Sequence, residues 1–483
     1  MGKKARTAIT PTREENFPEW YQQVIKAADM AENSPVRGCM IIKPYGFAIW
    51  ENMQNIFDPW LKDYGVQNAS FPLLIPLSFL EKEAEHIDGF AKECAVVTHH
   101  RLEASEEGGL VPAGKLEEPY VVRPTSETII GDAMARWVQS YRDLPLKLNQ
   151  WGNVMRWEMR TRMFLRTSEF FWHEGHNAFE TPEGAKEDCL TILDMYEKFF
   201  HEYLAFTGFK GIKTPDERFP GAIETYAFES LMQDGKALQA ATTHDLGQTF
   251  SKGCGIKFQN RNGDEEHAYT TSWAFSTRAI GGMIMIHGDD DGMMMPPFIA
   301  PQQVVILPVV KNIDDDGGII EFSEKIIAEL KTKGIRAQVD KRDMRTPDKM
   351  WDSIKKGIPL RVEIGGREME NGQVTFVRRD IGRESKETVS VDAFIQRAPE
   401  LLQSVHDNML ARSTKFRDDH TFDGNGLSDI QDFFKQDKVG LVRVPVSVLE
   451  EANLESVMKE YALSTRCMPF EDEGQKVLIG KAY

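Results

Sequence analysis

The segment that most constrains this chain is residues 153–176, NVMRWEMRTRMFLRTSEFFWHEGH. Apolar and aromatic residues fill both of its ends, and a basic tip containing Arg160 and Arg162 lies between them. This pattern predicts a β-hairpin, in which two strands are joined by a mobile, positively charged loop. Because side chains alternate between the two faces of a strand, Arg156 and Glu158 are expected to share one face.

The charges on this hairpin admit two interpretations. A surface hairpin laced with salt bridges is the plainer one, because charged residues are common on exposed strands. The other is a nucleotide site, in which arginines bind phosphates in fork geometry and an aromatic ring stacks on the base. Burying Arg156 or Glu158 alone is costly, so each needs an opposite charge or a large polar ligand.

Composition excludes several classes of protein. The chain has 483 residues, 41% of them hydrophobic, which is enough for two or three domains. It has no apolar run of about 18 residues and no stretch typical of a secretory signal, so we expect a cytoplasmic protein with no membrane partner. The five cysteines are scattered and form no Cys-x-x-Cys pair, which favours a reducing compartment.

The formal net charge is −17, which argues against indiscriminate binding of nucleic acid. Residues 331–380 nevertheless carry more Lys and Arg than Asp and Glu. Such a patch suits a partner that docks at one place, or is a solvated surface of mixed charge.

The N-terminal part predicts an arm, a helix and a possible dimer interface. Residues 1–16 are expected to form a flexible arm, with a helix beginning near Pro18. A long apolar helix is expected at residues 45–64, followed by an extended run at residues 68–76 that contains two prolines. Prolines confine that run to an edge or interface strand. The pair suits a symmetric dimer interface, and an ordinary core helix is the alternative.

A second informative stretch is residues 119–132, PYVVRPTSETIIGD. It predicts a strand that ends at Pro124 and a helix that continues through Trp137. Thr125 and Glu127 at the turn form part of a helix-capping pattern. Alternatively, this hydroxyl and carboxylate bind an ammonium or imino group.

A third stretch, residues 268–292, joins a strand to a helix, with Arg278 at the junction and two glycines shortly after it. Arg278 is expected to point into the same cavity as Arg156. Taken alone, it would be an ordinary surface arginine.

Beyond a linker at residues 293–301 the periodicity changes. Strands and helices alternate as far as a long helix at residues 391–412, which predicts a separate α/β domain with a largely parallel or mixed sheet. Residues 413–483 form a smaller tail domain.

These stretches occur together in one family. The chain resembles the class II aminoacyl-tRNA synthetases, and closely resembles the prolyl-tRNA synthetases of the archaeal and eukaryotic-like type. The resemblance is carried by GCMIIKPYGFAIWENM with FPLLIP (motif 1), VVRPTSET, LNQWGNVMRWE with FLRTSEFFWHEGH (motif 2), QAATTHDLGQTFS, SWAFSTRAIGGMIMIHGDDDG (motif 3), IPLRVEIGGRE and the terminal KAY. It runs from about residue 15 to 412 and returns at the end.

The resemblance implies a fold and an assembly. It implies an α+β catalytic domain at residues 17–295, with an antiparallel sheet flanked by helices, and an α/β anticodon-binding domain at residues 301–412. A small C-terminal α/β domain at residues 413–483 completes the chain. The resemblance also implies a homodimer through motif 1 and no large editing insertion between motifs 2 and 3.

The tail departs from the family pattern. Relatives often carry a four-cysteine zinc site there, but only Cys467 follows residue 412 in this chain. One thiolate cannot build a tetrahedral site, so no structural zinc is expected. The retained ending implies that the terminal carboxylate of Tyr483 docks near the catalytic domain.

The implied reaction is the ATP-dependent attachment of L-proline to tRNA(Pro) through prolyl-adenylate, with release of diphosphate and AMP. Mg2+ would bridge phosphate oxygens of ATP, so no metal-ligating residues are expected. A small apolar pocket discriminates by only about 1–3 kcal/mol per methylene. Misactivation of alanine and cysteine is therefore expected, with any correction performed in trans.

The family's functional residues map onto this chain one by one. The catalytic residues would be Arg156, holding the α-phosphate and the proline carboxylate, and Arg278, holding the γ-phosphate. The ATP-binding set is Arg156, Glu158, Arg166, Thr167, Phe170, Gln239, Thr242 and Arg278. The proline-binding set is Thr125, Glu127, Arg156, Trp172, Glu174, His176, His244 and Ser272.

Within these sets the implied roles differ. Phe170 would stack on adenine, and Glu158 would accept from the adenine amino group or orient Arg156. Arg166 would reach the outer phosphates, and Gln239 and Thr242 would contact ribose and phosphate. Thr125 and Glu127, helped by His244, would take the imino group of proline, while the rest of the proline set would wall and brace the ring pocket.

In the second domain, Arg361 and Arg367 match basic positions that face the anticodon guanines in the family. Arginine suits guanine O6 and N7, or stacking on an unpaired base. The segment 352–355 departs from the family's usual Trp-Glu-Leu-Lys. Ile354 stands in place of the usual Glu, so one polar base contact is expected to be missing.

Three rival functions fit parts of the pattern. Another class II synthetase, for threonine, glycine, serine or histidine, is disfavoured by the Thr125-Ser126-Glu127 turn and by residues 172–176. A non-catalytic paralogue would usually lose the motif 2 or motif 3 arginine, and both are present. An ATP-dependent ligase acting on a carrier protein would lack the anticodon-type domain.

Overall fold

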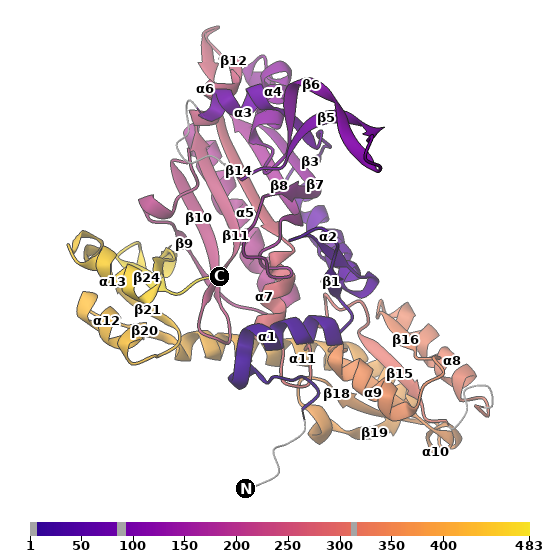
Figure 1. The fold of residues 1–483 in the computed structure, drawn as a ribbon. Helices are drawn as coiled ribbons and strands as arrows, with labels where there is room; N and C mark the ends of the chain where they lie inside the picture. Colours follow the sequence, from indigo (N-terminus) through magenta and orange to yellow (C-terminus); the bar gives the residue numbers. More distant parts are fainter. Residues whose placement is uncertain (1–6, 85–92, 311–315) are drawn as a thin grey trace.

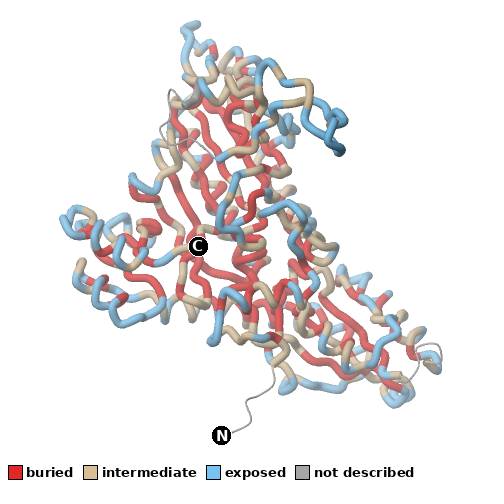
Figure 2. Tube along the Cα trace, viewed as in Figure 1, coloured by how far each residue is buried: buried red, intermediate tan, exposed pale blue. Residues whose placement is uncertain are grey.

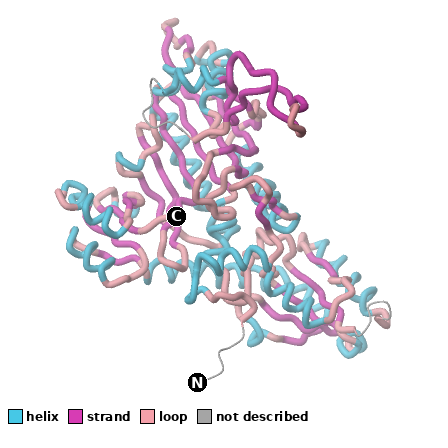
Figure 3. The backbone as a smooth tube through the Cα atoms, viewed as in Figure 1, coloured by secondary structure: helices cyan, strands magenta, loops and turns pink. Residues whose placement is uncertain are grey.

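The structure is a computed structural model that describes residues 7–84, 93–310 and 316–483 (Figure 1). It has a large domain built on an eight-stranded sheet, a second domain with a five-stranded sheet and a tail domain with a four-stranded sheet. The backbone view separates the long strands of the large domain from the helices and shorter strands around them (Figure 3).

The large domain is built on an eight-stranded sheet with the order β23-β9-β10-β11-β14-β8-β7-β3. Its neighbouring strands are antiparallel except for β3 and β7, which confirms the expected antiparallel sheet. The strands of this domain are β1 (Ala31–Asn33), β2 (Met40–Ile42), β3 (Gln67–Asn68), β4 (Leu74–Pro76), β5 (Val96–Ala104), β6 (Leu110–Val122), β7 (Leu146–Met155), β8 (Glu169–Phe179), β9 (Phe209–Ile212), β10 (Glu224–Leu231), β11 (Ala237–Gly247), β12 (Lys257–Gln259), β13 (Glu265–His267) and β14 (Tyr269–Ser276). Its helices are α1 (Arg13–Ala27), α2 (Pro44–Asp63), α3 (Leu77–Ala84), α4 (Glu127–Trp137), α5 (Pro182–Leu204), α6 (Thr249–Cys254) and α7 (Arg278–His287).

The core of the large domain lies where α2 and α5 pack on the sheet. Phe57 of α2 lies 5.4 Å from Tyr196 of α5 and 5.3 Å from Phe275 of β14, measured between ring centroids. All three rings are almost fully buried. The apolar helix predicted at residues 45–64 is therefore a core helix. Figure 2 shows that burial is concentrated along the sheet, whereas the β5–β6 hairpin is largely exposed.

The N-terminal arm differs from its prediction. Helix α1 begins at Arg13 and not near Pro18, because Glu15 accepts a hydrogen bond from the backbone N–H of Thr12 at 2.9 Å and so supports an earlier helix start. The backbone leaves the helical conformation at Asn16, which lets Pro18 sit in the first turn after a kink. Residues 7–12 are held against the large domain, and the first six residues of the predicted arm lie outside the described residues.

The second domain contains the mixed sheet that the sequence predicts, with the order β16-β15-β17-β18-β19. Strand β15 is parallel to β16 and β17, and the remaining pairs are antiparallel. Its elements are β15 (Val304–Pro308), α8 (Ile319–Thr332), β16 (Ala337–Val339), α9 (Thr346–Lys355), β17 (Leu360–Ile364), α10 (Gly366–Glu370), β18 (Gln373–Arg378) and β19 (Glu387–Ser390).

Helix α11 (Val391–Asp419) is longer than predicted, so the expected boundary at residue 412 falls inside it. Ser413 and Thr414 resemble a stop signal in the sequence. In the structure Thr414 donates to the carbonyl of Leu410 within the helix, and Ser413 accepts from the backbone N–H of Thr207. Both hydroxyls are thus satisfied without ending the helix, which connects the second domain to the tail domain.

The tail domain has a four-stranded sheet with the order β20-β21-β24-β22. Its elements are β20 (Thr421–Asp423), α12 (Leu427–Lys435), β21 (Leu441–Pro445), α13 (Leu454–Tyr461), β22 (Ser464–Thr465), β23 (Met468–Pro469) and β24 (Lys476–Gly480). Strand β23 leaves this sheet and pairs with β9 at the edge of the large sheet.

The chain end docks on the large domain, as Figure 1 shows. The backbone N–H of Tyr483 donates to the carbonyl of Ala237 at 3.0 Å, and its ring hydroxyl donates to Asp234 at 2.6 Å. The backbone N–H and the ring hydroxyl of Tyr483 therefore attach the chain end to the large domain, and a role for the terminal carboxylate stays a prediction. Within the described parts of the chain, no helix has the length and apolar character needed to cross a bilayer.

Candidate active site

The predicted hairpin is present as β7 and β8, with Met155 paired to Glu169 at the end next to the connecting loop. Arg156 extends the pairing by one hydrogen bond, from its N–H to the carbonyl of Ser168 at 2.8 Å. Arg156 and Glu158 lie beyond β7, in the connecting loop, so the prediction that they share one strand face is wrong.

The loop of this hairpin is anchored just after its basic tip, and the mobility of the tip itself stays a prediction. Phe164 and Leu165 are buried in the main core, and Phe164 has a left-handed backbone with φ 61°. The hydroxyl of Tyr21 in α1 donates to the carbonyl of Met163 at 2.7 Å. The two apolar residues after the tip find a core, and this outweighs the exposure favoured by the arginines around them.

Glu174 of β8 is the centre of a buried polar network. Its carboxylate accepts hydrogen bonds from Nε2 of His176 at 2.9 Å, from Nε2 of Gln150 at 3.1 Å, and from the backbone N–H of Ser126 at 3.2 Å. The Ser126 hydroxyl is a fourth donor. Burial opposes ionisation of Glu174, yet these donors hold its pKa below the ordinary value. Burial lowers the pKa of His176, but the hydrogen bond to the Glu174 carboxylate outweighs burial, so the pKa of His176 is raised.

The turn after β6 places Thr125 and Glu127 at the wall of the same cavity. The Thr125 hydroxyl donates to the Glu127 carboxylate, and both residues are buried. Helix α4 begins at Glu127 as predicted, but no side chain caps its first turn at Ser126. The capping interpretation is therefore not needed to explain these residues.

Arg156 and Arg278 are held by backbone carbonyls. Nε of Arg156 donates to Pro124 at 3.0 Å, and Nε of Arg278 donates to Leu165 at 3.1 Å. These bonds use only Nε, so the Nη groups of both arginines stay available to a ligand in the cavity. The Arg156 guanidinium also lies 5.4 Å from the ring centroids of both Phe170 and Trp172.

Electrostatics favour an anionic ligand between the two arginines. Burial, followed by the positive charges of Arg156 and Arg166, lowers the pKa of Arg278 to about 10. Burial likewise lowers the pKa of Arg156, with Glu127 and Glu174 opposing the shift. Arg156 remains accessible because it borders the open cavity. A ligand that brings negative charge would relieve this repulsion.

Most predicted residues meet at one cavity of about 240 Å³. The predicted residues that line it are Thr125, Glu127, Arg156, Phe170, Trp172, Glu174, His176, Gln239, Thr242, His244, Ser272 and Arg278. The sheet register explains this convergence, because on β14 Ser272 pairs with His176 of β8 and with His244 of β11. Side chains paired in this way share one face of the sheet.

Two lining residues have features that suit a ligand. The Ser272 hydroxyl is buried and has no hydrogen-bond partner among the described residues. Burial, followed by the charges of His176 and Arg156, lowers the pKa of His244 to about 3, so this imidazole is neutral at physiological pH. Its Nδ1 lies 3.0 Å from the hydroxyl of Thr225.

Three predicted ATP-binding residues do not line the cavity. Glu158 lies 3.8 Å from Nε of Arg166 and accepts from the backbone N–H of Arg160 at 2.8 Å. It does not orient Arg156, whose Nε is held by Pro124. The Thr167 hydroxyl donates to the carbonyl of Glu169 at 2.7 Å. A role in ATP binding for Glu158, Arg166 and Thr167 stays a prediction.

One wall of the cavity was not predicted from the sequence. Glu217, Arg218 and Phe219, in the connection between β9 and β10, line it together with Thr225. Phe219 packs against His244 with ring centroids 4.6 Å apart. The run from Thr214 to Glu217 predicts a short helical turn, which is present, but nothing in the sequence alone places that turn over the sheet. The bracing role of Gln150 on β7 was also not predicted.

The second domain has its own hollow, of about 510 Å³, between β16 and α9. Its charged lining residues are Asp340, Lys341, Arg342, Lys349, Asp352 and Lys356. Arg361 and Arg367 do not line it. Nε of Arg361 lies 3.3 Å from Glu363 on the same strand, and Arg367 is exposed on α10. Asp352, two residues before Ile354, lines this hollow and presents a carboxylate there. The loss of a polar base contact at Ile354 stays a prediction.

Comparison with known protein families identifies two regions. Residues 113–287 match the tRNA synthetase class II core domain (G, H, P, S and T), and residues 303–401 match the anticodon binding domain.

Individual relatives match nearly the whole chain. A proline–tRNA ligase of Bdellovibrio bacteriovorus is 51% identical over 99% of this chain and 97% of its own length. Proline–tRNA ligase 2 of Anaeromyxobacter dehalogenans is 54% identical over 86% of this chain and 82% of its own. A crystal structure of prolyl-tRNA synthetase from Cryptosporidium parvum, complexed with halofuginone and AMPPNP, has a TM-score of 0.88 and 34% identity, and the match covers 99% of both chains.

Proposed function

The chain belongs to the prolyl-tRNA synthetases, the proline–tRNA ligases of class II, and from that premise we propose that it charges tRNA(Pro) in two steps. The carboxylate of L-proline attacks the α-phosphate of ATP, which forms prolyl-adenylate and releases diphosphate. The terminal ribose of tRNA(Pro) then takes the prolyl group and releases AMP. Little covalent chemistry is required of the protein, so positioning and charge stabilisation carry the reaction.

The single observation that carries this proposal is the polarity of the cavity. The cavity presents the Nη groups of Arg156 and Arg278, whose Nε atoms are already bound to carbonyls. It also presents Glu127, Thr125 and a neutral His244. A substrate that is anionic at one end and cationic at the other fits this arrangement.

At the anionic end, Arg156 holds the α-phosphate and the proline carboxylate together, and Arg278 holds the γ-phosphate. Each charge-assisted hydrogen bond contributes about 1.5–3 kcal/mol. Phe170 stacks on adenine, and Gln239 and Thr242 contact the ribose and phosphates. Mg2+ would enter with ATP, which supplies phosphate oxygens as ligands.

At the cationic end, Thr125 and Glu127 take the imino group of proline. His244 lies on the same face of the sheet and accepts or donates as a neutral ring. Trp172 and His176 form the wall around the ring, and the free hydroxyl of Ser272 supplies one further polar contact. Glu174 does not need to touch the substrate to matter, because it fixes His176 and the Ser126 turn.

The decisive experiment is ATP–pyrophosphate exchange with each of the twenty amino acids and no tRNA. Proline is expected to support strong exchange, with weaker signals from alanine and cysteine. Exchange with a different amino acid would overturn the specificity, and exchange with none would require the assay to be repeated with tRNA.

Weak signals from alanine and cysteine are part of the proposal. A pocket that accepts the small ring of proline rejects a smaller side chain by only about 1–3 kcal/mol per methylene. The chain is not expected to correct the error itself. Hydrolysis of alanyl-tRNA by the purified protein would contradict that expectation.

The assembly and the second substrate site complete the proposal. The protein is cytoplasmic and acts as a homodimer, with α2 and the segment containing β3 and β4 at the interface. Leu73 and Leu74 in that segment are exposed, which suits burial by a second copy. The second domain binds the anticodon, with Arg361 and Arg367 as contact candidates beside the charged hollow. Sedimentation of the purified protein at twice the mass of one chain would support the dimer.

A further inference from the structure

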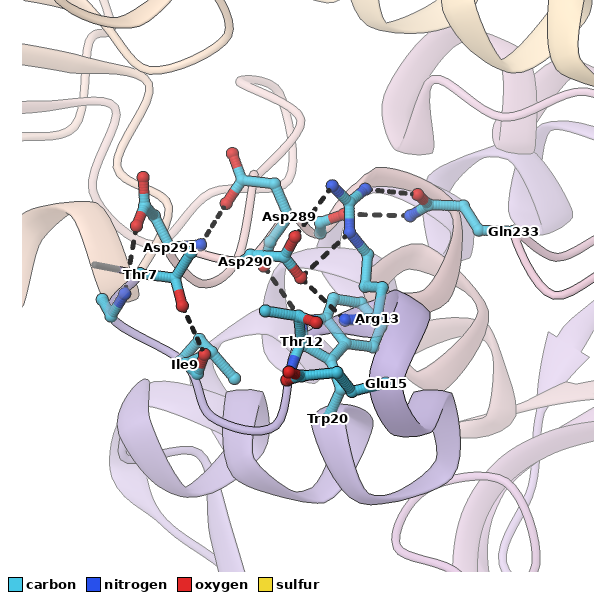
Figure 4. Close-up of polar contacts among 12 residues, drawn as sticks. Thr7, Ile9, Thr12, Arg13, Glu15, Trp20, Gln233, Asp289, Asp290 and Asp291 are labelled. Atoms are coloured by element: carbon cyan, nitrogen blue, oxygen red, sulfur yellow. Dashed lines mark hydrogen bonds and ion pairs between the residues drawn. The ribbon is translucent and has the colours of Figure 1, made fainter. Parts of the chain in front are cut away.

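Three consecutive aspartates follow helix α7, and each binds a different partner. Asp290 accepts hydrogen bonds from the backbone N–H and from Nε of Arg13, at 2.8 and 3.3 Å. Asp291 accepts one from the backbone N–H of Ala8 at 3.1 Å. Figure 4 shows the Asp290 carboxylate facing Arg13 and the Asp289 carboxylate turned the other way. Two of the three aspartates therefore hold the N-terminal segment, and Asp289 is left for another partner.

That partner is Arg379, which directly follows β18 of the second domain. Its Nη1 and Nη2 donate to the two carboxylate oxygens of Asp289 at 2.7 and 2.6 Å. The Arg379 side chain is 8% exposed and that of Asp289 is 29% exposed. A fork-shaped pair of this kind fixes both distance and orientation, so it constrains the two domains more tightly than a single contact.

The pair joins elements that lead to both substrate sites. Nε of Arg379 donates to the carbonyl of Ile354 at 3.0 Å, in helix α9, and α9 forms one side of the charged hollow. Asp289 lies two residues after α7, and the first residue of α7 is Arg278. The backbone carbonyl of Asp289 also accepts a hydrogen bond from Trp20 of α1 at 3.0 Å, which fixes its position (Figure 4).

Several other polar contacts join the second domain to the large domain. The hydroxyl of Tyr45 donates to the carbonyl of Lys356 at 3.0 Å. The backbone N–H groups of Met293 and Met295 donate to the carbonyls of Lys355 and Gly357, at 2.9 and 3.0 Å. Nε2 of His406 in α11 lies 2.8 Å from the carbonyl of His201 in α5. The Asp289–Arg379 pair is the salt bridge among these contacts, and its two Nη groups constrain orientation as well as distance.

We propose that the Asp289–Arg379 pair is a positioning joint that sets the orientation of the second domain for the transfer of proline to a whole tRNA. The inference rests on the proposed two-step function. A tRNA bound at its anticodon must present its terminal ribose to the cavity in the large domain. A displacement of about 1 Å at the reacting atoms can cost 10²-fold in rate.

Adenylate formation does not need the joint. Residues Ala279–Met285 of α7 are buried and packed in the core of the large domain, so Arg278 is held there independently of the second domain. Loss of the pair removes one constraint on the orientation of the second domain and leaves α7 in place. The two steps of the reaction should therefore respond differently to the same substitution.

The test uses four variants of the full chain, Arg379→Ala, Arg379→Lys, Asp289→Asn and the charge-exchanged Asp289→Arg with Arg379→Asp. Each is assayed for proline-dependent ATP–pyrophosphate exchange without tRNA, and for prolylation of transcribed tRNA(Pro). Exchange should stay within about two-fold of the parent. Prolylation should lose about ten-fold or more in kcat/KM for tRNA, mainly through kcat, within the usual range of inter-site coupling. Charge exchange should recover part of that loss.

Arg397→Ala is the matched control, because Arg397 forms a similar forked pair with Glu387, at 2.7 and 3.0 Å, entirely within the second domain. An exposed pair of this kind contributes little, so neither assay should change. Equal losses in both assays for Arg379→Ala, or no loss in either, would refute the joint. If the parent shows no exchange, the proposed function fails instead. If Arg379→Ala does not fold, Arg379→Lys and Asp289→Asn decide the result.

Discussion

Replacing Glu174 by Gln should damage proline recognition far more than ATP recognition. Each carboxylate oxygen of Glu174 accepts two hydrogen bonds: one takes the Ser126 hydroxyl and Gln150, the other takes His176 and the backbone N–H of Ser126. A glutamine presents one oxygen and one amino group. Whichever way it is turned, two donors face another donor.

The magnitude follows from that count. The Ser126 hydroxyl can rotate to accept a hydrogen bond, and a neutral His176 ring can accept at Nε2, so one buried donor loses its acceptor in either orientation. A buried donor without an acceptor costs about 1–3 kcal/mol, and the hydrogen bonds that remain lose their charge assistance. A total of about 3 kcal/mol corresponds to roughly 10²-fold in kcat/KM for proline.

The assay is ATP–pyrophosphate exchange with proline varied at saturating ATP, and then with ATP varied at saturating proline. The KM for proline should rise and the KM for ATP should change little, because Glu174 lies at the proline end of the cavity. Glu197→Gln is the control, since Glu197 binds Lys210 on the outer side of α5. Thermal unfolding separates loss of fold from loss of binding. An unchanged KM for proline in Glu174→Gln would refute the reasoning.

Four further predictions follow from the same contacts. Arg278→Lys should lower exchange by about 10²-fold or more, measured as kcat at saturating proline, because lysine keeps the charge but loses the fork that reaches the phosphates. Phe57→Ala should lower the free energy of unfolding by about 3–5 kcal/mol in a denaturant titration, because the ring is fully buried among Tyr196 and Phe275. The pKa of His176 is raised in the folded protein, so its pairing with Glu174 contributes stability that is fully present below about pH 6.5 and is lost as pH rises through the folded pKa. The melting temperature measured against pH checks this prediction. Glu174→Gln should abolish the pH dependence. Purified protein should contain far less than one zinc per chain by elemental analysis, and chelation should leave exchange unchanged, since Cys467 is buried and is the one cysteine after residue 412.

Local signals in the sequence predict a large part of this molecule. The β7–β8 hairpin, helix α2 and the turn that begins α4 all follow from short-range periodicity, proline positions and capping residues. The convergence of Arg156 and Arg278 also agrees with the prediction. These features depend on residues close together in the chain, or on a family resemblance that preserves their order.

What the sequence could not provide depends on distant contacts. The burial of Phe164 and Leu165 requires a partner surface on α1, and the wall formed by Glu217 and Phe219 requires the sheet beneath it. The attachment of Arg13 to Asp290, 277 residues further along the chain, is a second contact of this kind. No periodicity within a segment reports such a contact.

The pairing of β23 with β9 has a consequence for how the protein is made. Strand β9 leaves the ribosome at residue 212, but the strand that completes its edge is not synthesised until residues 468 and 469. At about 5–20 residues per second, that interval lasts roughly 13–50 seconds. Throughout it the nascent sheet presents an unpaired edge, which is a template for association with other chains. The pairing of Met468 and Pro469 with β9 thus covers this edge only at the end of synthesis. A chain that stops before these residues would be released with the edge of β9 still unpaired.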